Sequence, residues 1–200
     1  MDFTAWPPLL VVDVESNGRT PPDLVEVAAL PIRDGRPDPA TAGAWLIRPP
    51  RPVTPRAGRV HGLTDDVLAG HPAWDRVAEE VRGRLGTAWI AAHNAHVDHR
   101  ALSAHLPGWT PDGVIDTLRL ARTTLPGLPS YTLDHLIDHL HLDLTAAPAR
   151  RHRAIYDAYA AARLLLALAG RYPTWPALVA VAVPPGLPGG PGPRQDPTLW

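Results

Sequence analysis

Two carboxylates, Asp13 and Glu15, end an apolar run near the start of the chain, in residues 9–18. A short β-branched run bounded by turn residues predicts a buried strand, and strand alternation then places both acids on one face with Val14 on the other. Two unpaired anions on one face of a core strand repel each other and are costly to bury. The run contains no Lys or Arg, and hard divalent cations prefer carboxylate oxygens. The pattern therefore favours a Mg²⁺ or Mn²⁺ site, with solvent-exposed acids at a strand end as the alternative.

Two further acids are predicted to lie where helices begin beside the sheet. Asp98 follows a predicted strand at residues 89–92 and the turn at residues 93–95, and Asp157 lies one turn into a helix predicted from 154 to about 168. Sites in such sheets usually form where strands reach their carboxyl ends. Solvation or helix capping explains either acid alone, whereas the four acids together favour a shared metal site.

The elements that must position these acids follow from hydrophobic periodicity. The first strands are predicted to form a meander with Asp34-Gly35 as a hairpin turn, and residues 48–59, rich in Pro and Arg, are predicted to be a loop. Strands and helices alternate after Pro72, which implies a mixed sheet flanked by helices. The first predicted strand begins at residue 9, and the other four lie at residues 24–30, 44–47, 89–92 and 114–115.

Composition limits the class of protein. The chain has 200 residues, a net charge of −1, no Cys and no apolar run long enough to span a bilayer, so we expect a cytoplasmic protein without disulfides or membrane contact. Its 19 basic residues are all Arg, and the small net charge confines any nucleic-acid binding to a local surface. We predict one domain at residues 1–171 and a Pro/Gly-rich tail at 172–200, of which residues 177–183 are apolar enough to dock on the domain.

Taken in order, three segments resemble the motifs of the DEDDh branch of the DnaQ-like 3′–5′ exonucleases, which have a ribonuclease-H-like fold. The motifs are Asp13-Val14-Glu15-Ser16-Asn17-Gly18, His93-Asn94-Ala95-His96-Val97-Asp98 and His152-Arg153-Ala154-Ile155-Tyr156-Asp157. Val97 replaces an aromatic residue of the family. Arg153 occupies the position at which the tyrosine branch has Tyr, which indicates the histidine branch. The similarity covers roughly residues 8 to 170.

This resemblance implies an α/β fold with a ribonuclease-H-like mixed five-stranded sheet and a two-metal-ion mechanism. His152 would be the general base. Five helical residues place side chains about 140° apart, so we expect His152 to lie ahead of the last helix rather than inside it. The metal ligands implied are Asp13, Glu15, Asp98 and Asp157, and the residues implied to seat the terminal nucleotide are Ser16, His61 and Asn94.

The implied activity is hydrolysis at a single-stranded or frayed 3′ end of nucleic acid, with DNA favoured over RNA. Arginines at 150, 151 and 153 either hold substrate phosphates or are simply solvated. The alternatives are an RNA-trimming exonuclease of the same family and a non-catalytic nucleic-acid-binding module of this fold. Residues 195–200 faintly resemble peptides that dock on the sliding clamp, which makes a clamp or a DNA polymerase a candidate partner of the tail.

A histidine-based zinc site is the rival chemistry. His135 and His139 have the i, i+4 spacing of zinc-binding helices, but Leu136 lies where a metalloprotease needs a catalytic Glu. His96 and His99 lie one turn apart without an evident third ligand. The carboxylate site is therefore the preferred hypothesis.

Overall fold

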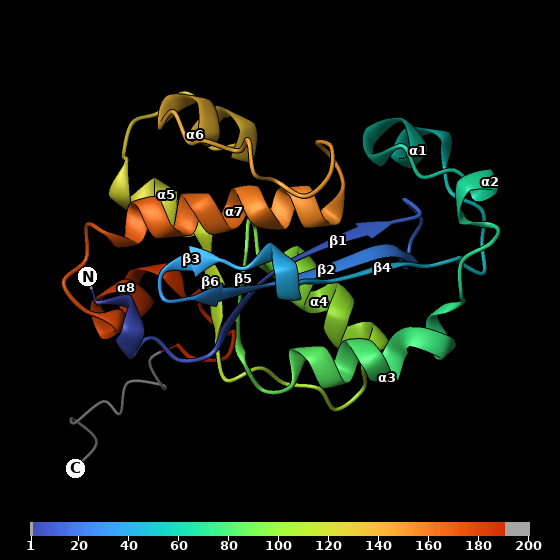
Figure 1. Cartoon of the computed structure of the whole chain (residues 1–200), viewed down its shortest axis with the longest axis horizontal. Helices are drawn as coiled ribbons and strands as arrows, with labels where there is room; N and C mark the ends of the chain where they lie inside the picture. The colour runs from blue at the N-terminus through green and yellow to red at the C-terminus, as the bar shows by residue number, and fades with distance from the viewer. Residues whose placement is uncertain (1, 191–200) are drawn as a thin grey trace, which may run out of the picture.

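Strand β1 (Leu9–Ser16) lies inside a six-stranded mixed sheet in the computed structural model, which describes residues 2–190 (Figure 1). The strand order is β3-β2-β1-β5-β6, and β4 also pairs with β2. β1 is antiparallel to β2 and parallel to β5, and β5 is parallel to β6. The other strands are β2 (Leu24–Arg33), β3 (Arg36–Pro37), β4 (Gly43–Leu46), β5 (Trp89–Ala92) and β6 (Val114–Asp116).

The predicted mixed sheet flanked by helices is confirmed, with six strands rather than five. The additional strand, β3, has two residues and follows the turn at Asp34 and Gly35, which both have positive φ angles. Such angles suit the tight turn of a hairpin. The hairpin partner of β2 is therefore β3 first, and β4 pairs with β2 farther along.

Helices cover both faces of the sheet (Figure 1). The residues of β1 alternate between the two cores, because Leu9 and Val11 pack towards α7 whereas Leu10 and Val12 pack towards α3 and α4. One layer contains α5 (Thr117–Thr124), α6 (Leu133–His139) and α7 (Ala154–Ala169), and the other contains α3 (Trp74–Leu85) and α4 (His96–His105). Asp13 and Glu15 continue the α7 face of β1 because they keep the same alternation.

Residues 55–61 form helix α1 (Pro55–His61), so the prediction of a loop across residues 48–59 was wrong for this part. The Thr54 side chain accepts a hydrogen bond from the backbone N–H of Ala57, and Pro55 occupies the first turn, where a missing N–H costs nothing. Gly62, with φ of 74°, ends the helix. Helix α2 (Asp65–Leu68) follows directly, and both lie near the carboxyl end of β1 (Figure 1).

The segment after the last long helix is partly structured. Helix α8 (Trp175–Ala182) packs on α5 and β6 and buries Leu178 and Ala182, which confirms that residues 177–183 dock on the domain. Two 3₁₀ helices, η1 (Phe3–Ala5) and η2 (Pro39–Thr41), complete the described elements. None of the helices in residues 2–190 has the length and hydrophobicity that a bilayer crossing requires.

Candidate active site

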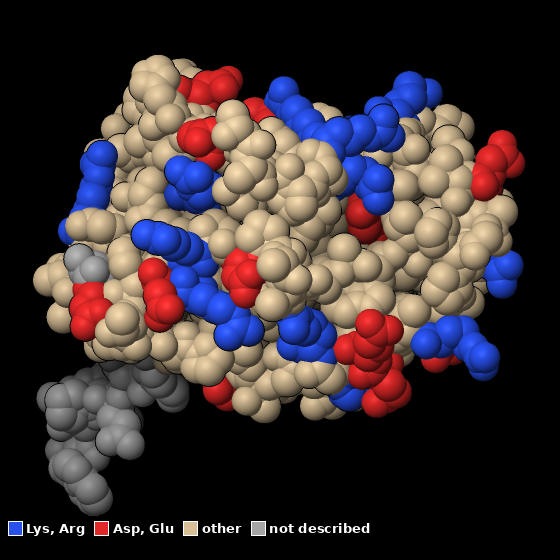
Figure 2. All heavy atoms as spheres, viewed as in Figure 1, with Lys and Arg blue, Asp and Glu red and all other residues tan. Residues whose placement is uncertain are grey.

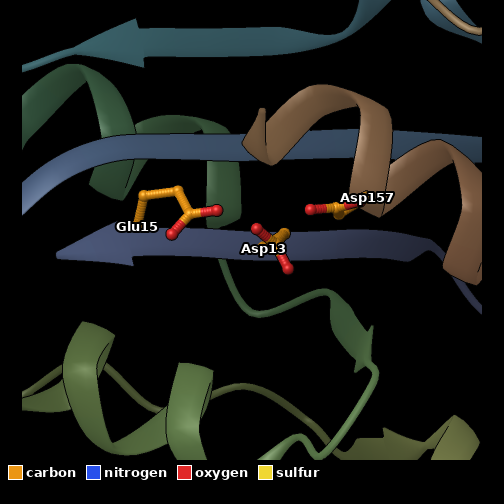
Figure 3. A group of neighbouring side chains, drawn as sticks. All are labelled: Asp13, Glu15 and Asp157. Carbon is orange, nitrogen blue, oxygen red and sulfur yellow. The ribbon is translucent and has the colours of Figure 1, made fainter. Parts of the chain in front are cut away.

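Three carboxylates meet on the α7 face of the sheet. Oxygen atoms of Asp13, Glu15 and Asp157 all lie within 4.8 Å of one another. The first two come from β1, and Asp157 comes from the first turn of α7, which crosses β1 and β2 (Figure 3). The structure thus brings together three of the four acids that the sequence predicted to share a site.

Asp98 approaches the same strand from the opposite layer. It lies in the first turn of α4, is 4% exposed, and its Oδ1 accepts a hydrogen bond from the backbone N–H of Val14 at 3.1 Å. β5 pairs with β1 only as far as Val11, so Asp98 occupies the edge of β1 that β5 leaves free. Asp98 is thus beside the three grouped carboxylates, near enough to raise the pKa of Asp13, but outside the group itself.

Burial disfavours the ionised forms of these carboxylates, and for Asp13 and Glu15 the charges of neighbouring acids add to this effect. Burial raises the pKa of Asp13 well above its usual value, and the charges of Asp98 and Glu15 raise it further. Burial, followed by the charges of Asp157 and Glu26, raises the pKa of Glu15 to about 8. Burial also raises the pKa of Asp98 to about 7 and that of Asp157 to about 6. This arrangement concentrates negative charge that a cation would relieve.

His152 lies just before α7, with a left-handed φ of 60°. The prediction that it precedes the helix is confirmed. Burial has the largest effect on the Asp157 pKa and raises it, whereas the neighbouring His152 lowers it. His152 is half-buried, so its side chain keeps access to solvent.

Glu26 is a site-adjacent acid that the sequence analysis overlooked. It lies opposite Glu15 in the β1–β2 register and is 2% exposed. Both of its oxygens accept hydrogen bonds from Arg153, at 2.7–3.1 Å, and one also accepts from the backbone N–H of Ala154 at 3.0 Å. The sequence did carry a sign of this pair, because a carboxylate inside the apolar run of residues 24–30 requires a buried partner.

The remaining arginines of this segment are arranged differently. Arg153 itself is paired with Glu26, so neither interpretation made from the sequence, a phosphate contact or simple solvation, describes this arginine. Arg151 forms an ion pair with Asp134 of α6, and the guanidinium of exposed Arg150 lies against Gly62 at the end of α1. In Figure 2 blue side chains gather at the upper right, over α1 and the start of α7 in the view of Figure 1.

His61 joins α1 to the end of β1. Its Nδ1 accepts a hydrogen bond from the Leu63 N–H at 3.0 Å, so its Nε2 carries the proton and donates to the Ser16 carbonyl oxygen at 3.2 Å. Burial lowers the His61 pKa, which favours this neutral form. Both ring nitrogens are thus bonded to the backbone, and His61 fixes the position of Ser16.

Asn94 lies in the turn between β5 and α4 with a left-handed φ of 68° and is exposed. Its N–H donates to Asp116 Oδ1 at 3.1 Å, and the same oxygen accepts from the Leu118 N–H at 2.8 Å as the N-cap of α5. Asp116 also accepts from the Arg119 N–H, so it caps α5 through two backbone bonds. Asp116 thereby ties the turn that precedes Asp98 to the neighbouring strand end.

The zinc alternative gains no support. His135 and His139 stack with ring centroids 6.1 Å apart. Among residues 2–190, however, the one group of three or more potential ligands is the carboxylate group of Asp13, Glu15 and Asp157. Carboxylate donors alone suit a hard divalent cation rather than zinc in a histidine site.

Comparison with known proteins agrees with this geometry. The family model RNase_T, described as an exonuclease, matches residues 10–165. The chain belongs to this family. Exodeoxyribonuclease 10 of Escherichia coli K12 is 33% identical to this exonuclease over 159 residues, which cover 79% of the chain and 67% of the relative. A PolC-type DNA polymerase III of Halalkalibacterium halodurans is 32% identical over 162 residues, or 78% of the chain, but the match spans only 11% of that polymerase.

Solved structures place the exonuclease in the same fold. Exonuclease X in complex with 5′ overhanging duplex DNA matches with a TM-score of 0.69 and 31% identity over 81% of this chain and 91% of that one. Exonuclease I of Escherichia coli in complex with a dT13 oligonucleotide has a TM-score of 0.70 at 18% identity, with 83% and 42% coverage, and supports the fold alone. The predicted ribonuclease-H-like class and membership of the DnaQ-like 3′–5′ exonuclease superfamily are confirmed, and the chain is a hydrolytic exonuclease.

Proposed function

We propose that this exonuclease removes nucleotides from the 3′ end of DNA with two divalent metal ions and His152 as general base. The observation that carries the proposal is the meeting of Asp13, Glu15 and Asp157 within 4.8 Å, beside a histidine that precedes α7. The 5′ overhanging duplex DNA bound by exonuclease X, which is 31% identical to this chain, supports DNA as the substrate class.

The donor set fits Mg²⁺ or Mn²⁺. All three grouped side chains are carboxylates, and burial is the largest cause of their raised pKa values. A bound dication would favour the ionised forms. Asp98 would complete the set from the α4 side, where its Oδ1 is already oriented by the Val14 N–H.

When bound, two such ions activate a water and stabilise charge on the phosphate in an in-line displacement. The role of His152 would be to take the proton of that water, since imidazole titrates near neutrality. Asn94 and Ser16 would seat the terminal nucleotide, each at the carboxyl end of a strand. His61 would act on Ser16 by holding its carbonyl rather than by touching the substrate.

The DNA strand would approach the site along the exposed arginines that border the carboxylates. Arg56 and Arg59 are exposed on α1, and exposed Arg150 contacts Gly62 at the end of that helix. The His61 to Ser16 bond places this end of α1 next to Glu15. Positive charge at this border suits the phosphates behind a 3′ terminal nucleotide.

The test uses matched single-stranded DNA and RNA oligonucleotides carrying a 5′ label, with Mg²⁺ or with EDTA. A ladder that shortens from the 3′ end of DNA in Mg²⁺ alone is expected. Faster digestion of RNA would make the RNA-trimming alternative correct. Binding without digestion would favour the non-catalytic module.

Two variants assign the roles. Asp13→Ala is expected to abolish Mg²⁺-dependent digestion with the fold retained by circular dichroism. His152→Ala is expected to slow it by about 10²–10⁴-fold. The control is Asp75→Asn, an exposed acid in the first turn of α3, which should leave the rate unchanged. Undiminished activity of Asp13→Ala would refute the ligand assignment.

The partners and location follow as proposals from the same function. A cytoplasmic site of action would give access to DNA during proofreading or repair. Docking of a sliding clamp or polymerase on residues 195–200 concerns a segment outside the described residues. Deleting these six residues and measuring clamp binding tests that idea directly.

A further inference from the structure

Glu26 and Arg153 form a buried ion pair directly behind the candidate site. Arg153 Nε lies 3.1 and 3.0 Å from the two Glu26 oxygens, and its terminal nitrogen lies 2.7 Å from one of them. The Glu26 side chain is 2% exposed and that of Arg153 is 22% exposed. A bidentate arginine–carboxylate pair of this kind fixes the relative orientation of the two side chains as well as the distance between them.

The pair also replaces the missing cap of α7. Arg153 is the N-cap residue, and its own side chain makes no capping bond. Glu26 instead accepts the Ala154 N–H at 3.0 Å, from a strand more than a hundred residues earlier in the chain. A carboxylate at this position satisfies a free N–H and suits the positive end of the helix.

We propose that Glu26 and Arg153 are positioning residues, which lock the start of α7 onto β2 and thereby hold His152 and Asp157 in place over the β1 carboxylates. This inference rests on the proposed function. Neither residue is assigned contact with substrate or metal, and the pair acts through the backbone on either side of residue 153.

The backbone conformation at His152 explains why the contacts of Glu26 and Arg153 are needed. His152 has a φ of 60°, a conformation that residues other than glycine rarely adopt. Such a conformation persists when the surrounding structure holds it. Residue 153 is held through its side chain and residue 154 through its N–H, so the chain leaving His152 has little freedom. Asp157 follows within the same helical turn, where its N–H bonds to the Arg153 carbonyl at 3.0 Å.

The first test measures kcat and KM for Arg153→Met and Arg153→Lys. Loss of a supporting partner typically lowers activity by about 10- to 100-fold, and we expect this loss in kcat while KM changes by less than about twofold. Lys keeps the charge but lacks the planar guanidinium that makes two parallel hydrogen bonds, so Arg153→Lys should recover only part of the rate that Arg153→Met loses. Arg33→Met, which removes the exposed ion pair with Asp38 at the far end of β2, is the matched control and should behave as wild type.

Removing Arg153 alone leaves Glu26 buried without its partner. The double variant Glu26→Gln with Arg153→Met therefore removes both charges together. It is expected to fold and to show the same loss in kcat. A double variant with the wild-type kcat would overturn the proposal.

The second test asks whether the pair acts through His152. In the His152→Ala background, Arg153→Met should cost less than about threefold, because residues that act as a unit are not additive. An equal loss of kcat in both backgrounds, together with a shift in the Mg²⁺ concentration that gives half-maximal activity, would show that the pair serves the metal ligands alone. This outcome would overturn the proposal that the pair positions His152.

The third readout needs no activity. In EDTA, amide hydrogen exchange of residues 150–157 should be about tenfold faster in Arg153→Met than in wild type or Arg33→Met. If the wild-type protein digests no DNA or RNA, the proposed function fails, and the exchange measurement still decides whether the pair holds this segment. Unchanged exchange would refute the lock.

Discussion

The repulsion among the site carboxylates should be measurable as stability, and Glu15 is the residue to change. Its pKa is raised from 4.5 to about 8 in the folded chain by burial and by the charges of Asp157 and Glu26. An acid with a raised folded pKa binds its proton more tightly in the folded state, so its contribution to stability is present below pH 4.5 and is lost as the pH rises towards 8. The free energy of unfolding of the metal-free protein should therefore decrease as the pH rises from 4.5 towards 8.

The size of the effect follows from the same interval. At about 1.4 kcal/mol for each pH unit, the rise from 4.5 to about 8 corresponds to at most about 5 kcal/mol. Glu15 is only partly buried and shares its repulsion with neighbouring acids, so screening reduces the expected difference to about 2 kcal/mol. Glu15→Gln, which has the same shape without the charge, should be more stable than wild type by about this amount at pH 8.

The assay is urea unfolding in EDTA at pH 5 and pH 8, followed by fluorescence of the seven tryptophans. The advantage of Glu15→Gln should be large at pH 8, small at pH 5, and reduced by Mg²⁺. Glu79→Gln is the control, because the Glu79 side chain is 85% exposed. If Glu15→Gln is no more stable than wild type at pH 8, crowding of the carboxylates does not destabilise the metal-free protein and creates no demand for a cation.

Two further predictions concern the elements that hold the site. Asp116→Ala removes the cap of α5 and the acceptor of the Asn94 N–H, and we expect a loss of about 2 kcal/mol in the free energy of unfolding, measured with urea. Gly62→Ala places a methyl group at φ of 74° and against the Arg150 guanidinium, and we expect a loss of about 1–2 kcal/mol. A Gly62→Ala variant with wild-type stability would show that this end of α1 relaxes freely, whereas Gly70→Ala, with open space around it, serves as the control.

The sequence predicted the strand framework well because alternation along β1 has few interpretations. Its apolar residues must face two cores, so Asp13 and Glu15 must share a face. The helix that carries Asp157 was equally clear, since it is long and free of Gly and Pro. These local patterns, with the resemblance of the three motifs, were sufficient to predict that the grouped acids lie close together.

What the sequence did not give depends on contacts between distant segments. Helix α1 was the exception, because its Pro and Arg content favours a loop although the Thr54 cap and Pro55 in the first turn are local signals of a helix start. The partner of Arg153 was missed because nothing local links it to Glu26. The separation of Asp98 from the other three acids likewise follows from its origin in the opposite helical layer.

The site draws on both ends of the domain, and this has a consequence during synthesis. Ribosomes extend the chain from its N-terminus, so β1 and β2 can pair long before α7 has been made. A nascent chain then carries Asp13 and Glu15 without the third carboxylate of their group. The carboxylate group is completed only when α7 has left the ribosome and packed on the sheet.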